Sequence, residues 1–271
     1  MTTGPVATMA TQRKKENSSS TRKLSVIVPA YNETENIEPL TERLFQACSE
    51  NNIDVDLLIM DDESVGSDAS LEKVKGLQSK YKDSQHTVRI HCRKKIEGKG
   101  LASAVILGFE KARYDTLLCM DADLQHEPEA VPKVAAPVLT GRSEFSVGSR
   151  FAAGGEIGKN WPAHRRLISW VATMLAVPLA ATSDPMSGFF CLTKDVFQRG
   201  RESLQVSGFK ISLELMARCK PNKIIDVGIS FKERVAGESK LTMKQNVEYL
   251  KQLATLYVAN MLWLVILMFF A

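Results

Sequence analysis

Two aspartates, Asp121 and Asp123, stand one residue apart directly behind the apolar residues 116–120. Such a run predicts a buried strand, and carboxylates at its end repel each other unless a cation lies between them. Mg²⁺ binds one or two protein carboxylates and completes its shell with water and phosphate oxygens. We therefore expect Asp121, Asp123 and Gln125 to bind Mg²⁺ or Mn²⁺ together with a nucleotide diphosphate. An isolated pair would be read as solvated loop acids; the buried strand and a second acidic strand end favour the metal.

That second strand end is the VDLLIMDD segment, residues 55–62. Carboxylates pair with ribose hydroxyls or with the donor edge of a base, as the acid of a dinucleotide site does. We assign nucleoside recognition to Asp62 and the neighbouring backbone of Met60. Glu63 and Asp68 are explained almost as well as helix-capping acids, so they are not assigned to the site.

The elements that must position these groups alternate along the chain. Strands are expected at 24–29, 55–62, 88–95, 116–123 and 145–151, and helices at 39–48, 99–114 and 129–141. This alternation predicts an α/β fold with a mainly parallel sheet and helices on both faces. Because sites in such sheets lie at the carboxyl ends of strands, residues 29–33, 61–62, 121–125 and 150 should share one crevice.

Composition narrows the class of protein. The chain has 271 residues, a net charge of +4 and five cysteines, none in a CxxC pair. Its basic residues lack the long clusters of a nucleic-acid binder, so no nucleic-acid partner is expected. The cysteines suggest reduced thiols in the cytosol and no zinc site. Residues 1–23 are polar, without the apolar core of a signal peptide, and predict a disordered leader.

The carboxyl terminus has a different character. No charged residue follows Lys251, and about 20 uncharged residues match the length of a transmembrane helix. We expect a membrane anchor at 252–271, although a buried helix of a soluble core is the alternative. The basic segment 234–251 would precede it and keep the globular domain, 24–233, in the cytosol.

A set of ordered motifs resembles the family-2 glycosyltransferases: VPAYNE, IMDDES, GKGLASA, MDADLQHEP, GSRF, SDPMSGFF and RVAGESK. The resemblance covers roughly residues 24–250 and is strongest to the members that mannosylate dolichyl phosphate. It implies a GT-A type, Rossmann-like fold and inverting transfer from GDP-mannose to dolichyl phosphate. It also implies an endoplasmic reticulum membrane location with the catalytic domain facing the cytosol, and no obligatory protein partner.

The resemblance also assigns roles to individual positions. Asp121, Asp123 and Arg150 would be catalytic, with Arg150 near the phosphates. The chain departs from the family pattern in DDESVGSD and at Glu97 and Lys99, but neither departure removes a residue that the mechanism requires. The residues implied to bind the nucleotide sugar are Pro29, Tyr31, Glu33, Met60, Asp62, Asp121, Ala122, Asp123, Gln125, Arg150, Arg234 and Lys240.

A phosphate acceptor needs cations more than it needs a base. Its second pKa lies near 6, so it is already a nucleophile at neutral pH. The uncharged stretch 167–183 suits an interfacial helix region at 164–183. A basic cluster precedes the stretch and consists of Lys159, His164, Arg165 and Arg166. We hypothesise that Arg165 or Arg166 binds the lipid phosphate. Nonspecific attraction to anionic lipid is the alternative. Asp184, where relatives acting on sugar hydroxyls keep a base, is expected to organise this acceptor site through hydrogen bonds to the basic cluster.

Three other functions remain open at this point. A polyprenyl-phosphate glucosyltransferase that uses UDP-glucose shares these motifs, but we would expect an amino-terminal membrane segment. A noncatalytic, membrane-tethered nucleotide-binding module would be expected to lack some metal or phosphate ligands. A soluble sugar nucleotidyltransferase shares the parallel sheet, but the apolar tail and the lack of a Gly-rich loop after the first strand disfavour it.

Overall fold

The computed structural model describes residues 21–62, 67–157, 163–205, 210–231 and 243–270, and within these the side chains of 157, 163–169, 243–246 and 261–270 are not described. The predicted 1–20 part of the leader therefore lies outside the described residues. So do Arg234, Lys240 and the side chains of Arg165 and Arg166.

The central sheet has seven strands in the order β3-β2-β1-β4-β7-β5-β8. All its neighbours pair in parallel except β7, which is antiparallel to both β4 and β5. This mixed, mostly parallel sheet with its helices confirms the predicted α/β class. Its strands are β1 (Arg22–Ala30), β2 (Ile53–Asp61), β3 (Thr87–Cys92), β4 (Thr116–Cys119), β5 (Phe145–Ser149), β7 (Phe190–Thr193) and β8 (Ile224–Gly228).

The observed strands differ from the sequence prediction in several details. The first strand begins at Arg22 rather than residue 24, because Arg22 pairs with Ile53 and extends the ladder between β1 and β2. The four-residue strand β7 was not predicted, because FCLT is too short to show a strand period. A small parallel sheet joins β6 (Glu156–Ile157) to β9 (Ser230–Phe231) at the margin of the main sheet.

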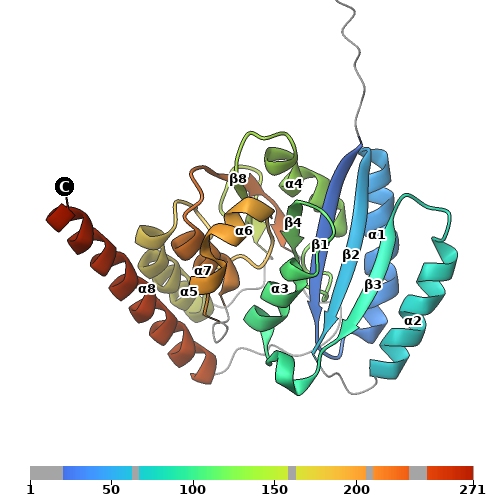
Figure 1. Cartoon of the computed structure of the whole chain (residues 1–271), viewed down its shortest axis with the longest axis horizontal. Coiled ribbons are helices and arrows are strands. Elements are labelled where there is room, and N and C mark those ends of the chain that lie inside the picture. The colour runs from blue at the N-terminus through green and yellow to red at the C-terminus, as the bar shows by residue number, and fades with distance from the viewer. Residues whose placement is uncertain (1–20, 63–66, 158–162, 206–209, 232–242, 271) are drawn as a thin grey trace, which may run out of the picture.

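Helices cover both faces of the sheet (Figure 1). On one face the core contains residues of α1 (Ile37–Glu50), α2 (Ser67–Lys80) and α4 (Val131–Leu139). On the other face it contains residues of α3 (Leu101–Glu110), α6 (Lys194–Gly200), α7 (Ile211–Cys219) and α8 (Met243–Phe270).

The sheet is buried on both sides, and its strand sequences show why. In β1, Val26 and Val28 pack on the α1 face, while Ile27 between them packs on the α3 face. Successive strand residues point to opposite faces, so a strand covered on both sides is apolar throughout. Burial of consecutive residues fixes the register, and the register places the strand ends side by side.

α8 lies on the opposite side of the molecule from α2 (Figure 1), together with α5 (Ala163–Ala176). The Tyr249 hydroxyl of α8 donates to the Ala172 carbonyl at 2.6 Å, and the Tyr257 hydroxyl donates to the Leu175 carbonyl at 2.7 Å. α5 ends at Ala176, and Val177–Leu179 continue as a short 3₁₀ helix that contains Pro178. In the part of the chain that the structure describes, no helix is long and apolar enough to span a bilayer.

Candidate active site

The predicted strand ends meet at one edge of the sheet. The register pairs Pro29 with Met60 and Ile27 with Cys119, and the Met120 amide donates to the Ile27 carbonyl at 3.2 Å. The carboxyl ends of β1, β2 and β4 are therefore adjacent. The antiparallel direction of β7 brings the segment before Phe190, including Asp184, to this same edge.

The turn after β4 holds the two aspartates of the predicted metal site. Its tight path depends on Leu124, whose φ of 61° lies in the left-handed region. The Gln125 amide donates to Asp123 Oδ1 at 3.1 Å, which fixes the mostly buried carboxylate of Asp123. The Asp121 side chain is 39% exposed.

His126 closes this turn and was not singled out from the sequence. Its Nδ1 accepts from the Asp121 amide at 3.3 Å and lies 3.4 Å from Asp121 Oδ2. The ring packs against Phe189 and Phe231, and this burial lowers the pKa of His126. A neutral imidazole whose Nδ1 accepts a backbone hydrogen bond supports the turn and leaves metal binding to oxygen ligands.

The donor set fits a hard divalent cation. Asp121, Asp123 and the Gln125 side chain offer oxygens from a single turn, as Mg²⁺ and Mn²⁺ prefer. Among the described residues, no three His, Cys, Asp or Glu side chains converge on one point. Mg²⁺ commonly takes one or two protein carboxylates and receives its other oxygens from water and phosphate.

Asp121 also has a close neighbour on the loop before β7. A Cβ added at Gly188 would lie 3.2 Å from Asp121 Oδ2 and 3.3 Å from Oδ1. Ser187 anchors this loop, because its hydroxyl donates to the Gly148 carbonyl at 2.7 Å. The glycine thus allows the loop backbone to approach the metal-site carboxylate.

Arg150 and Asp184 form a buried pair at the end of β5. Asp184 is fully buried and accepts from Arg150 Nε at 2.8 Å and from Nη2 at 2.9 Å, in addition to the Arg150 amide at 3.2 Å. The guanidinium carbon lies 5.5 Å from the Phe151 ring centre and 5.4 Å from that of Phe231. Asp184 therefore orients Arg150, whereas the sequence analysis expected it to organise Arg165 and Arg166.

A second carboxylate fixes the segment that carries Asp184. Asp226 of β8 accepts from the Thr182 hydroxyl and, at 2.7 Å, from the Ser183 amide. Neither Asp226 nor its contact with residues 182 and 183 was anticipated from the sequence. These residues are far apart in the chain, and only the order of the strands in the sheet brings them together. The result is an arginine whose position depends on a chain of buried contacts from β8.

The predicted nucleoside residues lie at the ends of β1 and β2. Tyr31 is 48% exposed, and Asn32, with a φ of 58°, turns the chain after β1. The Glu33 carboxylate accepts from the side-chain amide of Asn36, Nδ2, at 2.8 Å. The Met60 side chain is buried in the core, so only its backbone is placed to meet a ligand.

Asp62 is already held by two donors. Arg93 Nη1 donates to its Oδ1 at 2.9 Å, and the Gly100 amide donates to its Oδ2 at 2.8 Å. Arg93 also donates to the carbonyls of Glu97 and Gly98, so it ties the loop after β3 to Asp62. Arg93 was not singled out from the sequence, because it lies inside the strand expected at 88–95, whereas β3 ends at Cys92.

A further residue missed from the sequence is Lys210, the residue preceding α7. Its ammonium interacts electrostatically with Arg150, Asp121 and Asp184. The apolar helix that follows gave no reason to single it out. Topology explains its place: α7 leads into β8, whose carboxyl end lies at the site edge, so the start of α7 lies there too.

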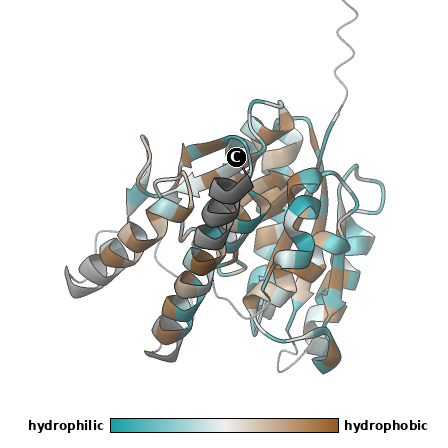
Figure 2. Cartoon of the chain, turned by 60° about the vertical axis from the view of Figure 1, so that its left-hand side comes forward, coloured by the Kyte–Doolittle hydropathy of each residue, from teal (hydrophilic) through white to brown (hydrophobic). Residues whose placement is uncertain are grey.

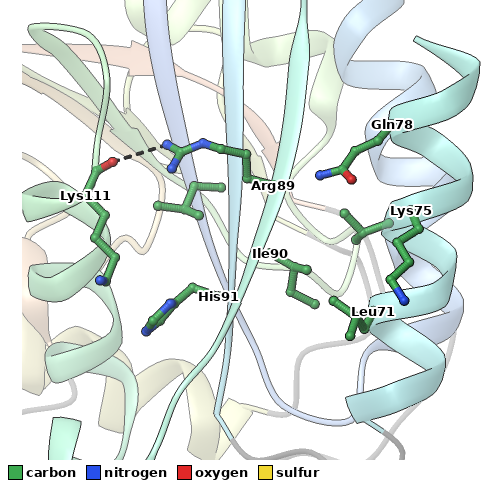
Figure 3. Close-up of a pocket in the computed structure, with 9 residues that line it drawn as sticks. Leu71, Lys75, Gln78, Arg89, Ile90, His91 and Lys111 are labelled. Carbon is green, nitrogen blue, oxygen red and sulfur yellow. Dashed lines mark hydrogen bonds between the residues drawn. The ribbon is translucent and has the colours of Figure 1, made fainter. Parts of the chain in front are cut away.

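A hollow with a volume of about 580 Å³ lies elsewhere, between α2 and the edge strand β3 (Figure 3). Arg89 and His91, which line it, already have acidic partners. Arg89 binds Asp56 and donates to the Lys111 carbonyl at 3.2 Å (Figure 3), and His91 contacts Glu97 at 2.9 Å. No residue predicted for the active site lines this hollow, so it is not a candidate for the same chemistry.

Comparison with solved structures supports the fold. Glucosyl-3-phosphoglycerate synthase from Mycobacterium tuberculosis, in complex with Mn²⁺, UDP-glucose and phosphoglyceric acid, aligns with a TM-score of 0.55 at 18% identity, over 88% of this chain and 79% of the other. Mannosyl-3-phosphoglycerate synthase from Rubrobacter xylanophilus aligns with a TM-score of 0.54 at 17% identity, over 88% and 74%. At this identity the likeness concerns the fold alone.

Sequence comparison is more specific. Proteins named dolichol-phosphate mannosyltransferase are 43% identical in Mycosarcoma maydis, over 89% of this chain and 81% of the relative, and 44% identical in Saccharomyces cerevisiae, over 86% of each. A third, from Pyrococcus furiosus, is 40% identical over 85% of this chain and 62% of its own length. The family description "Glycosyl transferase family 2" matches residues 25–201. The chain therefore belongs to glycosyl transferase family 2, the family that its strand-end motifs resemble.

Proposed function

We propose that this chain transfers mannose from GDP-mannose to dolichyl phosphate, giving dolichyl phosphate mannose and GDP with inversion at the anomeric carbon. The identity of 40 to 44% to proteins named for this activity supports the assignment. The structural observation that carries it is the oxygen-rich turn of Asp121, Asp123 and Gln125 beside Arg150, at the carboxyl edge of the parallel strands.

On this proposal, Asp121, Asp123 and Gln125 would hold Mg²⁺ or Mn²⁺ against the donor diphosphate. When bound, the cation offsets the negative charge that accumulates on the departing GDP. Arg150 adds a second positive charge near the diphosphate, and its pairing with Asp184 positions it in advance. Ala122 stands between the two aspartates, and its backbone would lie along the bound diphosphate.

The acceptor phosphate needs no general base, since much of it is dianionic at neutral pH. This agrees with the contacts of Asp184, whose two oxygens accept from Arg150. Arg165 or Arg166 would add positive charge to the acceptor site. Arg234 and Lys240 would close over the donor.

The nucleoside would lie over the ends of β1 and β2, against Pro29, Tyr31, Glu33 and the Met60 backbone. Asp62 retains acceptor capacity beyond its two bonds, because an ionised carboxylate offers about four lone-pair sites. Anchoring by Arg93 and Gly100 would fix its orientation before the nucleoside binds.

We further propose that the α5 and α8 side faces a bilayer. Brown segments recur along both helices in Figure 2. An exposed tryptophan among aliphatic side chains is typical of a protein–membrane interface. The proposal includes the carboxyl-terminal anchor at 252–271 and an endoplasmic reticulum location facing the cytosol. The exposed apolar residues are Trp170, Val171, Met174, Leu175 and Val177 near α5, and Val247, Leu250 and Val258 on α8.

The test of the activity uses the detergent-purified full chain, radiolabelled GDP-mannose and dolichyl phosphate, with and without EDTA. Parallel reactions contain UDP-glucose. We expect the wild-type chain to form mannolipid only when a divalent metal is present. The control Asp83→Asn, which changes an exposed carboxylate, should behave in the same way, and Asp123→Asn should be inactive. Transfer from UDP-glucose alone would reassign the donor, and no transfer from either would refute the enzyme assignment.

The test of the membrane-facing surface is vesicle flotation. Trp170 is 59% exposed and Met174 is 46% exposed, so Trp170→Ser with Met174→Ser should weaken binding to phosphatidylcholine–phosphatidylserine vesicles without changing the fold. The matched control replaces Ile96, which is 92% exposed but lies in the loop after β3, with serine. Equal flotation of all three proteins would exclude this surface as a contributor.

A further inference from the structure

The two positive centres of the proposed active site follow strands that are not neighbours. The metal turn, residues 121–126, follows β4, and Arg150 follows β5, while β7 lies between these two strands in the sheet. Because neighbouring strands lie about 4.8 Å apart, the ends of β4 and β5 are separated by about 10 Å. If the bound cation and Arg150 are to act on one diphosphate, a contact across this gap has to fix their relative position.

Phe231 of β9 contacts both centres. Its ring centre lies 5.3 Å from that of His126, with the two rings inclined at 63°, and the backbones of these two residues form an antiparallel bridge. The same phenyl ring has its centre 5.4 Å from the guanidinium carbon of Arg150. An aromatic face attracts a cation within about 6 Å, so the ring holds the guanidinium by electrostatic attraction as well as by packing. One side chain therefore spans the gap between the turn after β4 and the arginine after β5.

His126 carries this contact to the metal-site carboxylate. Its Nδ1 accepts from the Asp121 amide at 3.3 Å and lies 3.4 Å from Asp121 Oδ2. Its ring centre also lies 5.1 Å from that of Phe189, which is fully buried. The Phe189 carbonyl accepts from the Gly148 amide of β5 at 2.8 Å. Rings from β9 and from the residue before β7 thus confine His126, and with it the backbone at the start of the metal turn.

The backbone that carries Phe231 is itself fixed. The amide of the buried Ile229 donates to the Ser149 carbonyl at 3.0 Å, and the Ile229 carbonyl accepts from the Glu156 amide at 3.0 Å. The next two residues then pair in parallel with β6. A ring on a backbone held at both of these points has a defined position relative to the end of β5.

Asp184 and Phe231 restrict Arg150 in different ways. Asp184 binds the Nε and Nη2 groups by hydrogen bonds, whereas Phe231 contacts the guanidinium and the metal turn together. Loss of the ring should therefore leave the arginine its charge and its carboxylate partner. It should remove the contact that joins the arginine to the metal turn.

We propose that Phe231 is a positioning residue that sets the distance between Arg150 and the metal turn, so that both positive charges meet the same donor diphosphate. The inference rests on the proposed function and deepens it, because it names the side chain that joins the two halves of the diphosphate site. It predicts a selective defect. A nucleoside diphosphate, which can reach both centres, should lose affinity when the ring is removed, while a nucleoside monophosphate should be affected far less.

The test measures the Kd for GDP and the Kd for GMP by calorimetry in the presence of Mn²⁺, with the full-length chain in detergent. Phe231→Leu removes the ring and keeps an apolar side chain, and Phe231→Tyr keeps the ring. The matched control is Tyr114→Leu, because the Tyr114 ring is also half-buried and its centre lies 5.6 Å from Lys23 Nζ, but it precedes β4 at the opposite end of that strand. Loss of a cation–π contact predicts that Phe231→Leu weakens GDP binding about 5- to 30-fold. The control should bind both nucleotides as the wild type does, and Phe231→Tyr should retain the GDP affinity.

The double variant Phe231→Leu with Arg150→Met identifies the path of the effect. If the ring acts through the arginine, Phe231→Leu should weaken GDP binding much less in the Arg150→Met background than in the wild type. Full additivity would overturn the proposal, as would the same selective loss in Tyr114→Leu or unchanged affinity for both nucleotides. Equal weakening of GDP and GMP would make Phe231 a structural residue.

Parallel titrations with UDP and UMP separate this inference from the choice of donor. Binding of the uridine nucleotides alone would reassign the donor, and the same comparison of diphosphate with monophosphate would then test Phe231. A wild-type chain that binds neither diphosphate would refute the proposed function and this inference with it.

Discussion

The buried pair of Arg150 and Asp184 yields the sharpest prediction. Asp184→Asn removes the charge that holds the guanidinium in place by bonds of 2.8 and 2.9 Å, at a position with no solvent exposure, while only 13% of the Arg150 side chain is exposed. Breaking a buried ion pair by removing one partner typically costs about 3–5 kcal/mol. At about 2–4 °C per kcal/mol for a domain of this size, the Tm should fall by about 6–20 °C.

The activity should fall as well, because Arg150 loses its orientation. The assay is kcat/KM for mannose transfer at saturating GDP-mannose, for Asp184→Asn, Arg150→Met and the double variant, with the exposed Asp83→Asn as control. If Asp184 acts through Arg150, adding Asp184→Asn to Arg150→Met should cost little further activity. A general base would contribute about 10²–10⁴-fold independently of the arginine. The reasoning is refuted if Asp184→Asn alone loses more than about 10²-fold in activity with an unchanged Tm, and loses as much again in the Arg150→Met background.

Three more outcomes follow from the geometry. Asp123→Asn should weaken Mn²⁺ binding in the presence of GDP, measured by calorimetry, and unchanged affinity would remove Asp123 from the metal site. Gly188→Ala places a Cβ 3.2 Å from the Asp121 carboxylate and should raise the Mn²⁺ concentration for half-maximal activity several-fold. The control Gly76→Ala, whose Cβ would have nothing within 4 Å, should leave this concentration unchanged. Equal responses of the two variants would contradict the close approach. Burial lowers the pKa of His86, so the folded protein favours the neutral imidazole. The free energy of unfolding should therefore be fully present above the unfolded pKa of about 6.5 and should decrease as the pH falls below that value. Denaturant unfolding at several pH values should show a less steep decrease for His86→Gln.

The alternation of strands and helices was predictable because a parallel strand buried on both faces is apolar throughout. Val26 to Val28 and Leu57 to Ile59 show this pattern directly. The short strand β7 could not be found in this way. Its four residues pair with β4 and β5 only because the chain returns between them, and that return is a property of the assembled sheet.

The candidate site divides along the same line. The acids at 61–62 and 121–123 could be located because each follows a recognisable strand. Their partners could not, because Arg93 meets Asp62 across 31 residues of sequence and Arg150 meets Asp184 across 34. Such pairs have no fixed separation in sequence, because that separation depends on the lengths of the helices and strands between the two residues.

The sequence by itself determined which strand ends carry the acidic groups of the proposed metal and nucleoside sites, because strand periodicity and the common polarity of parallel strands are local properties of the chain. Only the tertiary structure decided which cation binds each carboxylate, as Arg93 binds Asp62 and Arg150 binds Asp184. The physical reason is that such a charged contact depends on the order and register of the strands that carry the two residues, and neither is encoded in the spacing of the residues that finally meet.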